Sequence, residues 1–294
     1  MVKFKESVIQ KTLKSTVTAE GIGLHSGATA RIELVPAKDG GIVFRSEGKS
    51  TGEIKALYSN VVETKLGTTI GYSGLPVIST IEHLMAAIWA CGIDNLIVNV
   101  SGGEIPAMDG SSTYFIGKIM KAGIVELPGN TRKLLKIKKE LTVEDGDKSI
   151  KISPAYNFSV DMSVEFDYGG IDSQHYYFNG SRRKFIRDIS TARTFCNYGD
   201  IEHMKKNGLA KGGSLDNAMV LDENGLVNPD GLRYDDEVVR HKILDCVGDM
   251  FTSGYSIRGA IVANRSGHEL NNRLLKKIFS DGDNYFIENG KMVV

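Results

Sequence analysis

Three imidazole and carboxylate side chains recur at four-residue spacing in the segment Asp235–Phe251. His241, Asp245 and Asp249 fall at i, i+4 and i+8, and at about 100° per residue these positions form one stripe along a helix. A histidine and a carboxylate one turn apart can bind one metal ion from the same side, as helical zinc sites do. The alternative is an ordinary solvated polar face.

A catalytic zinc ion usually has three protein ligands, so a third must come from another part of the chain. His83 lies in the strongly apolar segment Thr80–Cys91 and directly follows Glu82, the sole acid of that segment. A histidine there is often a core residue. A glutamate beside a ligand histidine, however, lies near the metal without binding it, as general bases do in zinc proteases. We therefore predict His83 as the third ligand and Glu82 as the base.

Other candidate residues lie in turns. His268 follows a predicted strand and enters a predicted helix, where exposed loop residues are often functional, although an ordinary surface histidine has the same pattern. The glycine-rich segment Gly21–Gly27 predicts a hairpin turn, because a phosphate-binding loop would open a helix instead. Cys246 lies about 140° around the helix from His241, which predicts a core position. His175 and His203 lie among polar residues and have no evident partner.

Hydrophobic periodicity predicts an α+β protein. Helices are expected over Thr80–Cys91, with Thr80 as N-cap and Gly92 as C-terminal stop, from after Ser111 to Lys121, and over Asp235–Phe251. The predicted strands are Ser7–Thr18, Ala28–Pro36, Gly41–Arg45, Leu96–Val100, Leu134–Val143, Ser149–Pro154, Ser159–Phe166 and Ala260–Ala263. The segment Leu127–Asn130 is typical of a linker, which predicts one domain at 1–128 and a second at 129–294.

A weak internal repeat relates the two predicted domains. The helix and strand over 81–100 align with those over 243–263, and His83 then falls opposite Asp245. Duplication of one unit explains the repeat, and a chance likeness of two helix–strand units explains it equally well.

The composition is that of a soluble globular protein. Lys+Arg and Asp+Glu both number 36 in 294 residues, so no basic excess indicates nucleic acid, although a local basic cluster could still bind an anion. No apolar run approaches the ~20 residues of a membrane span, and the N-terminus lacks the pattern of a secretory signal. Three widely spaced cysteines, Cys91, Cys196 and Cys246, indicate reduced thiols and a cytoplasmic location.

The chain resembles the UDP-3-O-acyl-N-acetylglucosamine deacetylases of lipid A biosynthesis over nearly its whole length. The resemblance rests on six separated motifs in the family's order: Gly21–Gly27, Thr80–Met85, Pro106–Ser111, Ala192–Phe195, Arg240–Asp245, and Ser266–His268 with Asn271–Asn272. It implies two domains of similar two-layer β/α sandwich topology with the active site between them. It also implies a monomeric, zinc-dependent hydrolase that removes the N-acetyl group of UDP-3-O-(3-hydroxyacyl)-N-acetylglucosamine and releases acetate.

The resemblance also implies roles for individual residues. His83, His241 and Asp245 would bind one zinc ion, which iron(II) could replace. Glu82 would be the general base, and His268, supported by Asp249, the second catalytic group.

Substrate contacts follow from the same resemblance. Thr194 would be the oxyanion donor, Lys242 and Phe195 would contact substrate, and the segment formed by Lys65, Leu66 and Gly67 would lie near the metal. The insert near 195–220 would form the passage for the acyl chain. Cys196 stands where the family pattern has glycine, and 197–211 is polar for a passage wall, so the preferred acyl length stays open.

Two other functions are compatible with parts of this pattern. A metal-free sugar-nucleotide binding protein of the same fold would bind the UDP-sugar without releasing acetate. A metalloprotease would carry His-Glu-x-x-His, which is absent from the sequence.

Overall fold

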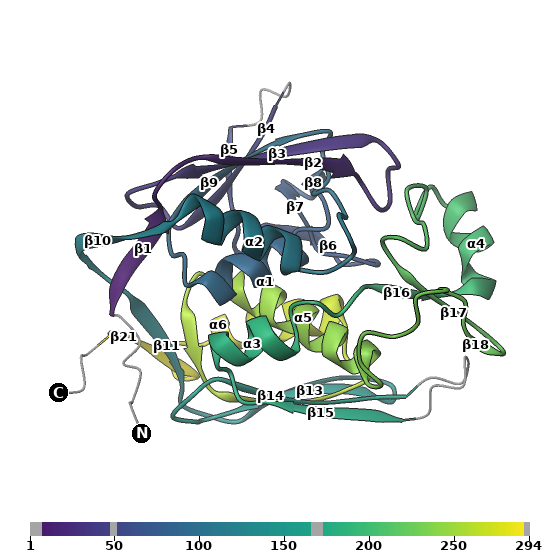
Figure 1. Cartoon of the computed structure of the whole chain (residues 1–294). Coiled ribbons are helices and arrows are strands. Elements are labelled where there is room, and N and C mark those ends of the chain that lie inside the picture. Colours follow the sequence, from purple (N-terminus) through teal and green to yellow (C-terminus); the bar gives the residue numbers. More distant parts are fainter. Residues whose placement is uncertain (1–7, 48–51, 166–172, 291–294) are drawn as a thin grey trace.

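The computed structural model describes residues 8–47, 52–165 and 173–290. Two five-stranded sheets enclose two layers of helices, so the order of layers is sheet, helix, helix, sheet (Figure 1). The predicted α+β class is confirmed. The helices of the first half are α1 (Glu82–Cys91) and α2 (Thr113–Ala122), and those of the second half are α3 (Arg182–Asp188), α4 (Ile201–Lys206), α5 (Glu237–Phe251) and α6 (His268–Phe279).

The first sheet has the strand order β2-β3-β9-β4-β5. The central β9 is antiparallel to β3 and parallel to β4. In β3 the apolar Ala30, Ile32 and Leu34 face the helices, whereas Arg31 and Glu33 alternate with them. The strands are β2 (Val17–Ile22), β3 (Thr29–Pro36), β4 (Ile42–Ser46), β5 (Glu53–Lys55) and β9 (Leu96–Ser101).

The second sheet has the order β12-β13-β20-β14-β15 and repeats the directions of the first. Its central β20 is antiparallel to β13 and parallel to β14. In each half one helix, α1 or α5, precedes the central strand. The two halves therefore share a topology, and gene duplication remains a hypothesis. The strands are β12 (Leu141–Asp145), β13 (Lys148–Ser153), β14 (Ser159–Val164), β15 (Gln174–Phe178) and β20 (Ala260–Asn264).

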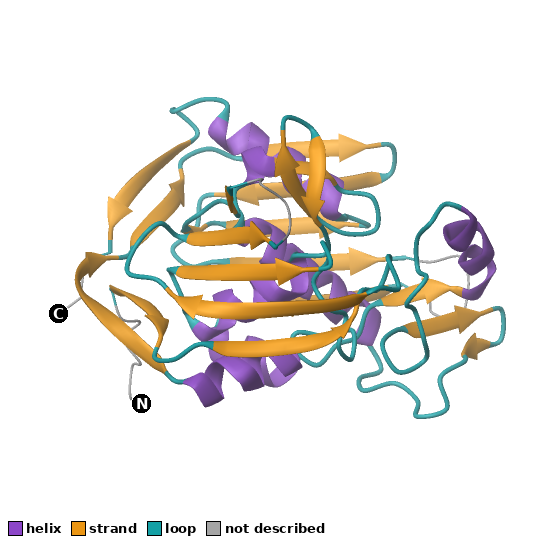
Figure 2. Ribbon diagram, turned by 90° about the horizontal axis from the view of Figure 1, so that it is seen from above, coloured by secondary structure: helices purple, strands orange, loops and turns teal. Residues whose placement is uncertain are grey.

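Smaller elements join and extend the two halves. Strand β1 (Ile9–Leu13) pairs with β10 (Ile124–Thr131), and β11 (Lys133–Ile137) lies between β19 (Ser256–Arg258) and β21 (Tyr285–Asn289). A small sheet near the active site contains β6 (Val61–Glu63), β7 (Thr69–Tyr72) and β8 (Leu75–Ile78). The insert contains β16 (Phe195–Asn197), α4, β17 (Met219–Asp222) and β18 (Gly225–Leu226), and it projects from one end of the molecule (Figure 2). The described residues also include the 3₁₀ turns η1 (Tyr58–Asn60) and η2 (Tyr198–Asp200).

Two predicted strands were wrong. Ser7–Thr18 is not one strand, because the described chain turns after Leu13 and divides into β1 and β2, and Ser7 lies outside the described residues. Leu134–Val143 likewise divides into β11 and β12. Leu127–Asn130 lies within β10, at the point where the register with β1 shifts between Ile9 and Lys11.

The predicted N-cap of α1 is also wrong. Thr80 makes no capping hydrogen bond; its φ is +59°, and its hydroxyl donates to Glu104 across 3.2 Å. The C-terminal prediction is confirmed, because Gly92 ends α1 with φ at +69°. None of the helices among the described residues is long and apolar enough to cross a membrane.

Candidate active site

Helix α1 places Glu82 and His83 in its first turn, inside the molecule. The helix is apolar on all sides because it is enclosed between α2 and α5. Ser112 donates its hydroxyl to the His83 carbonyl across 2.9 Å, which ties this turn to the start of α2. Gly248 lets α1 and α5 approach closely, since a Cβ atom there would lie only 2.1 Å from the Glu82 carbonyl oxygen.

Helix α5 carries the predicted stripe, and each of its members is buried. The solvated-face alternative for His241, Asp245 and Asp249 is therefore wrong. The structure also extends the stripe by one turn, because the buried Glu237 precedes His241 by four residues. Cys246 is buried in the core, as predicted.

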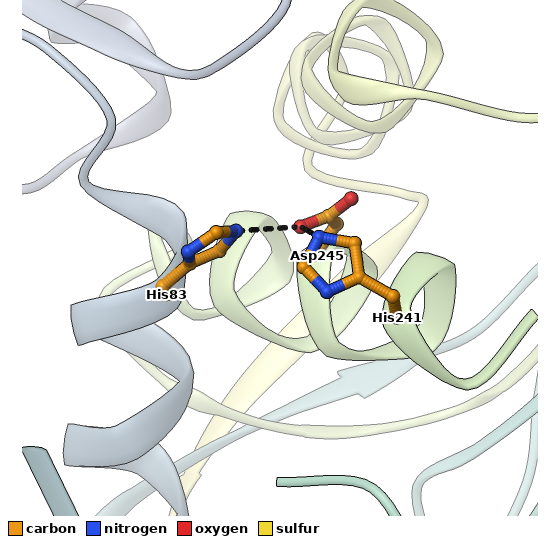
Figure 3. A group of neighbouring side chains, drawn as sticks. All are labelled: His83, His241 and Asp245. Carbon is orange, nitrogen blue, oxygen red and sulfur yellow. Dashed lines mark ion pairs between the residues drawn. The ribbon is translucent and has the colours of Figure 1, made fainter. Parts of the chain in front are cut away.

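The side chains of His83, His241 and Asp245 converge between α1 and α5 (Figure 3). Nε2 of His83 lies 3.5 Å and Nε2 of His241 lies 3.4 Å from Oδ1 of Asp245. Ligand atoms about 2.1 Å from a tetrahedral zinc ion would lie about 3.4 Å apart. Among the described residues, this Oδ1 is also the one buried side-chain polar atom without a hydrogen-bond partner. A divalent metal ion fits this donor set, because it would satisfy the oxygen together with two imidazole nitrogens.

The pKa shifts of His241 and Asp245 suit metal binding. Burial lowers the pKa of His241 to about 4, against the opposing effect of Asp245. Its Nδ1 lies 3.0 Å from the carbonyl of Ala192, which can only accept, so the hydrogen is on Nδ1 and Nε2 has a free lone pair. Burial alone would raise the pKa of Asp245, but His241 and His83 hold it well below its usual range. Burial likewise opposes the charged form of His83, yet Asp245 and Glu82 raise its pKa overall.

Glu82 lies beside the metal ligands but faces a different partner. Its Oε2 accepts the backbone N–H of Thr68 across 2.8 Å. Burial raises the pKa of Glu82, and the neighbouring imidazoles of His268 and His83 only partly offset that effect. A carboxylate whose pKa is raised toward neutrality is suited to accept and return a proton.

His268 begins α6 and lines the cavity beside His241 and Asp245. Its Nδ1 lies 2.9 Å from Oδ2 of Asp249, and Asn271 donates to the same oxygen across 2.8 Å. Burial alone would lower the pKa of His268, but Asp249 outweighs burial and raises it to about 9. The structure thus brings Asp249 and His268 together as an ion pair, and His268 is not an ordinary surface histidine.

A cavity of about 560 Å³ opens over these groups. Thr194, Phe195 and Lys242 line it together with His241, Asp245 and His268. The ring of Phe195 contacts the His241 ring edge-on, with centroids 6.1 Å apart. Nζ of Lys242 lies 4.0 Å from Oδ2 of Asp245, so it adds positive charge at the mouth of the site.

The predicted segment Lys65–Gly67 forms a wall of the site. Leu66 lines the main cavity and has a left-handed backbone with φ at +57°. Lys65 and Gly67 line a neighbouring hollow instead. A Cβ atom on Gly67 would lie 3.2 Å from Oε1 of Glu82, so the absence of a side chain lets this wall lie against the carboxylate.

Comparison with known proteins agrees with this geometry. Residues 10–280 match the model of the UDP-3-O-acyl N-acetylglycosamine deacetylase family. The chain belongs to this family. The protein named UDP-3-O-acyl-N-acetylglucosamine deacetylase in Geobacter sp. (strain M21) is 46% identical over 280 residues, which cover 95% of this chain and 91% of the relative. The protein of the same name in Syntrophotalea carbinolica is 43% identical over 287 residues, which cover 97% of this chain and 92% of the relative. The deacetylase of the same name in Myxococcus xanthus is 45% identical over 280 residues, which cover 95% of this chain and 88% of the relative.

Thr68, a residue of this deacetylase site, was missed from the sequence. Thr68 is buried, and its N–H donates to Glu82 while its hydroxyl donates to Oδ1 of Asp249 across 2.6 Å. It directly follows the predicted Lys65–Gly67 segment. Its position next to this segment was the one available signal, because its partners Glu82 and Asp249 lie 14 and 181 positions away.

His25 was also missed, since its glycine-rich loop was predicted only as a hairpin. The hairpin itself is confirmed, because β2 and β3 pair as antiparallel neighbours. The buried carboxylate of Glu104 holds the loop by accepting the N–H groups of His25 and Ser26 across 2.8 and 2.9 Å. The ring then bridges two walls of the cavity: Nε2 lies 3.0 Å from the Leu66 carbonyl, and Nδ1 accepts the N–H of Ala210 across 3.4 Å.

The insert supplies the wall that Ala210 belongs to. Met204 and Ala210, both from the segment predicted to be too polar, line the cavity with Cys196 and Ala218. The polar side chains of this segment include the exposed Lys205 and Lys206. The segment therefore contributes the apolar Met204 and Ala210 to the cavity wall, together with the polar Asn197 and Asp200.

Proposed function

We propose that this chain is a zinc-dependent deacetylase that removes the N-acetyl group of UDP-3-O-(3-hydroxyacyl)-N-acetylglucosamine and releases acetate in lipid A biosynthesis. The observation that carries the proposal is the buried cluster of His83, His241 and Asp245, whose Oδ1 has no other partner. Membership of the deacetylase family and the names of its relatives support the substrate. The metal-free alternative has no comparable support.

The metal site draws on both halves of the chain. His83 would come from the half at 1–128, and His241 and Asp245 from the half at 129–294, which we propose as the two domains. When bound, zinc supplies Lewis-acid stabilisation of negative charge on the amide oxygen and lowers the pKa of water in the site. Iron(II) accepts the same two imidazoles and one carboxylate, so the metal must be identified by measurement.

Glu82 is the proposed general base. Its carboxylate is buried beside the ligands without belonging to them, and its raised pKa lets it take a proton from the attacking water. The N–H of Thr68 donates to Oε2 of Glu82, and Oε1 lies beside Gly67, which has no side chain to cover it.

His268 is the proposed acid and Thr194 the proposed oxyanion donor. An amine leaves poorly without a proton, and His268 stays cationic near neutral pH because Asp249 accepts from its Nδ1. Its other nitrogen, Nε2, would then donate to the departing amine. The Thr194 hydroxyl would stabilise the charge that develops on the amide oxygen, a contact whose loss costs about 3 kcal/mol in other hydrolases.

Recognition of the substrate is assigned to the cavity walls. Lys242 would attract the anionic nucleotide, Phe195 and Leu66 would pack on the sugar and the beginning of the acyl chain, and the 195–220 insert would form the acyl passage. Lys65 and Gly67 would complete the wall behind Leu66. We further propose that the chain acts as a monomer in the cytoplasm, since one chain supplies the three ligands and its cysteines are free thiols.

Metal analysis combined with an acetate-release assay tests this function. The purified chain should contain about one zinc or iron ion, and acylated UDP-N-acetylglucosamine should release acetate in a chelator-sensitive reaction. UDP-N-acetylglucosamine without the acyl chain is the control, and it should react far more slowly if the passage contributes binding energy. Binding of the acylated nucleotide with no acetate release from a metal-loaded chain would refute the deacetylase proposal.

A further inference from the structure

Arg193 and Glu237 form a buried ion pair at the beginning of α5, behind the metal ligands. Glu237 is 0% and Arg193 5% exposed. Oε1 of Glu237 accepts from Nε of Arg193 across 2.8 Å, and Oε2 accepts from a terminal guanidinium nitrogen across 3.0 Å. Oε2 also accepts the N–H of Arg233 across 2.6 Å, and the guanidinium donates to the Gly231 carbonyl across 2.8 Å. The pair is thus saturated with hydrogen bonds and offers no binding site of its own.

The same carboxylate also holds the backbone of Arg193. Oε1 of Glu237 accepts the N–H of Arg193 across 3.0 Å. That N–H shares a peptide plane with the carbonyl of Ala192, which accepts from Nδ1 of His241 across 3.0 Å. In a trans peptide the N–H and C=O are coplanar and point in opposite directions. One rigid unit is therefore held at both ends by side chains of α5.

The spacing on α5 matches this peptide unit. Glu237 and His241 are four residues apart, so their side chains project from one face about 6 Å apart along the helix axis. The Ala192–Arg193 peptide spans the distance between these two side chains, with its N–H at Glu237 and its carbonyl at His241. If Glu237 released its end, the plane could rotate, and the carbonyl would no longer be aimed at the imidazole.

The direction of the Ala192 carbonyl matters because its hydrogen bond with Nδ1 fixes the tautomer and orientation of His241. Metal-binding histidines almost always donate their second nitrogen to such an acceptor, and loss of that acceptor typically weakens metal binding 10- to 100-fold. The next residue along the chain is Thr194, the proposed oxyanion donor, so the same anchor also sets the position of its hydroxyl.

We propose that the Arg193–Glu237 pair positions the metal-binding imidazole of His241 and the hydroxyl of Thr194 through the Ala192–Arg193 peptide. Both are positioning residues rather than catalytic ones, because neither lines the cavity. The proposal rests on the proposed function for the identity of the metal, and its test therefore includes Zn²⁺ binding without substrate.

The chain offers a matched control in a second buried pair. Arg132 is 4% exposed, and its Nε and a terminal nitrogen each donate to Asp94 across 2.7 Å. Asp94 also accepts a backbone N–H, that of Lys11, across 2.8 Å. The pair lies at the far end of α1, where Arg132 donates to the Gly92 carbonyl. Asp94→Asn therefore reports what loss of one charge from such a pair does to the fold in general.

The experiment compares Glu237→Gln with Asp94→Asn in the full chain. Zn²⁺ affinity is measured by competition with a chelating dye, and the ¹⁵N shifts of the His241 ring report its tautomer. Glu237→Gln should weaken Zn²⁺ binding about 10-fold, broaden or shift the His241 nitrogens, and lower kcat with little change in KM. Asp94→Asn should leave all three unchanged.

Equal Zn²⁺ affinity, equal His241 shifts and equal kcat in the two variants would overturn the positioning role. If Glu237→Gln does not fold, the double variant Arg193→Met with Glu237→Leu replaces the charges by apolar groups, which buried pairs often tolerate. It still leaves the peptide N–H without its acceptor, so it should show the same weakened Zn²⁺ binding, and unchanged binding would again overturn the proposal. Failure of the unmodified chain to bind Zn²⁺ would instead refute the proposed function itself.

Discussion

Thr68 and Asp249 are joined by a hydrogen bond of 2.6 Å between the threonine hydroxyl and Oδ1, although 181 positions separate them in the chain. The N–H of the same threonine donates to Glu82 across 2.8 Å. Asp249 in turn accepts from His268. Thr68 therefore links the proposed base to the proposed acid pair, and it does so between the two halves of the molecule.

Replacing Thr68 with valine should uncouple these groups. The N–H to Glu82 remains, but Oδ1 of Asp249 loses its donor, and an unsatisfied buried acceptor costs about 1–3 kcal/mol. We expect kcat to fall about tenfold with little change in KM, since Asp249 does not line the cavity. Thr68→Ser keeps the hydroxyl and should retain most activity. Equal kcat values for the valine and serine variants would show that the hydroxyl has no role.

The division of labour between Glu82 and the metal ligands gives a second prediction. Glu82→Gln should keep zinc bound and lower turnover by about 10²-fold or more, because the amide cannot accept the proton. His241→Ala should lose the metal, because it removes one of three ligands. Metal content and kcat of both proteins provide the measurement. Loss of zinc from Glu82→Gln would make Glu82 a ligand, and full zinc content in His241→Ala would refute the metal site.

The His268–Asp249 pair predicts a specific pH dependence. The pKa of His268 is raised to about 9, so kcat should fall as pH rises through about 9 and the donor loses its proton. In Asp249→Asn the charge that raises the pKa of His268 is gone, whereas burial still lowers that pKa. The alkaline limb of the pH–rate profile should therefore move to lower pH. A pH–rate profile of each protein is the measurement, and coincident alkaline limbs would contradict the role of Asp249.

The same pair should contribute to stability in a defined pH range. The folded pKa of about 9 lies above the ordinary value of 6.5, so the contribution is complete below about pH 6.5 and is lost as pH rises through about 9. Urea unfolding near pH 6 and near pH 10 should show a larger loss of unfolding free energy in the unmodified chain than in Asp249→Asn. Parallel losses in the two proteins would exclude a raised pKa at His268.

Local periodicity was sufficient for the parts of the site that lie on one helix. His241, Asp245 and Asp249 could be predicted because four residues make about one helical turn. His83 required the neighbouring Glu82 and the family motifs, since an isolated histidine on an apolar helix resembles a core residue.

Contacts between distant segments could not be predicted in this way. Thr68 and His25 act through partners that the fold brings together, and no periodic pattern marks them. Glu237 continues the four-residue spacing of His241, but its partner Arg193 is likewise supplied only by the fold. Strand β10 was missed for a similar reason: Pro128 and Gly129 indicate a local irregularity, which the structure has as a register shift, whereas the pairing of the flanking residues with β1 depends on a segment far away in the sequence. At Thr80 the local capping preference was overridden because its hydroxyl bonds to Glu104 and its backbone is left-handed.

The close approach of α1 and α5 gives the last prediction. A Cβ atom on Gly248 would lie 2.1 Å from the Glu82 carbonyl, so Gly248→Ala must force the two helices apart. We expect a loss of about 1–3 kcal/mol in unfolding free energy and weaker Zn²⁺ binding, because His83 lies on one helix and His241 on the other. The matched control is Gly117→Ala in α2, where a Cβ atom meets nothing within 4 Å. That change should stabilise the chain by up to about 1 kcal/mol, as alanine favours an exposed helix over glycine. Urea unfolding and dye competition measure both effects, and a Gly248→Ala protein as stable as Gly117→Ala would contradict the tight helix contact.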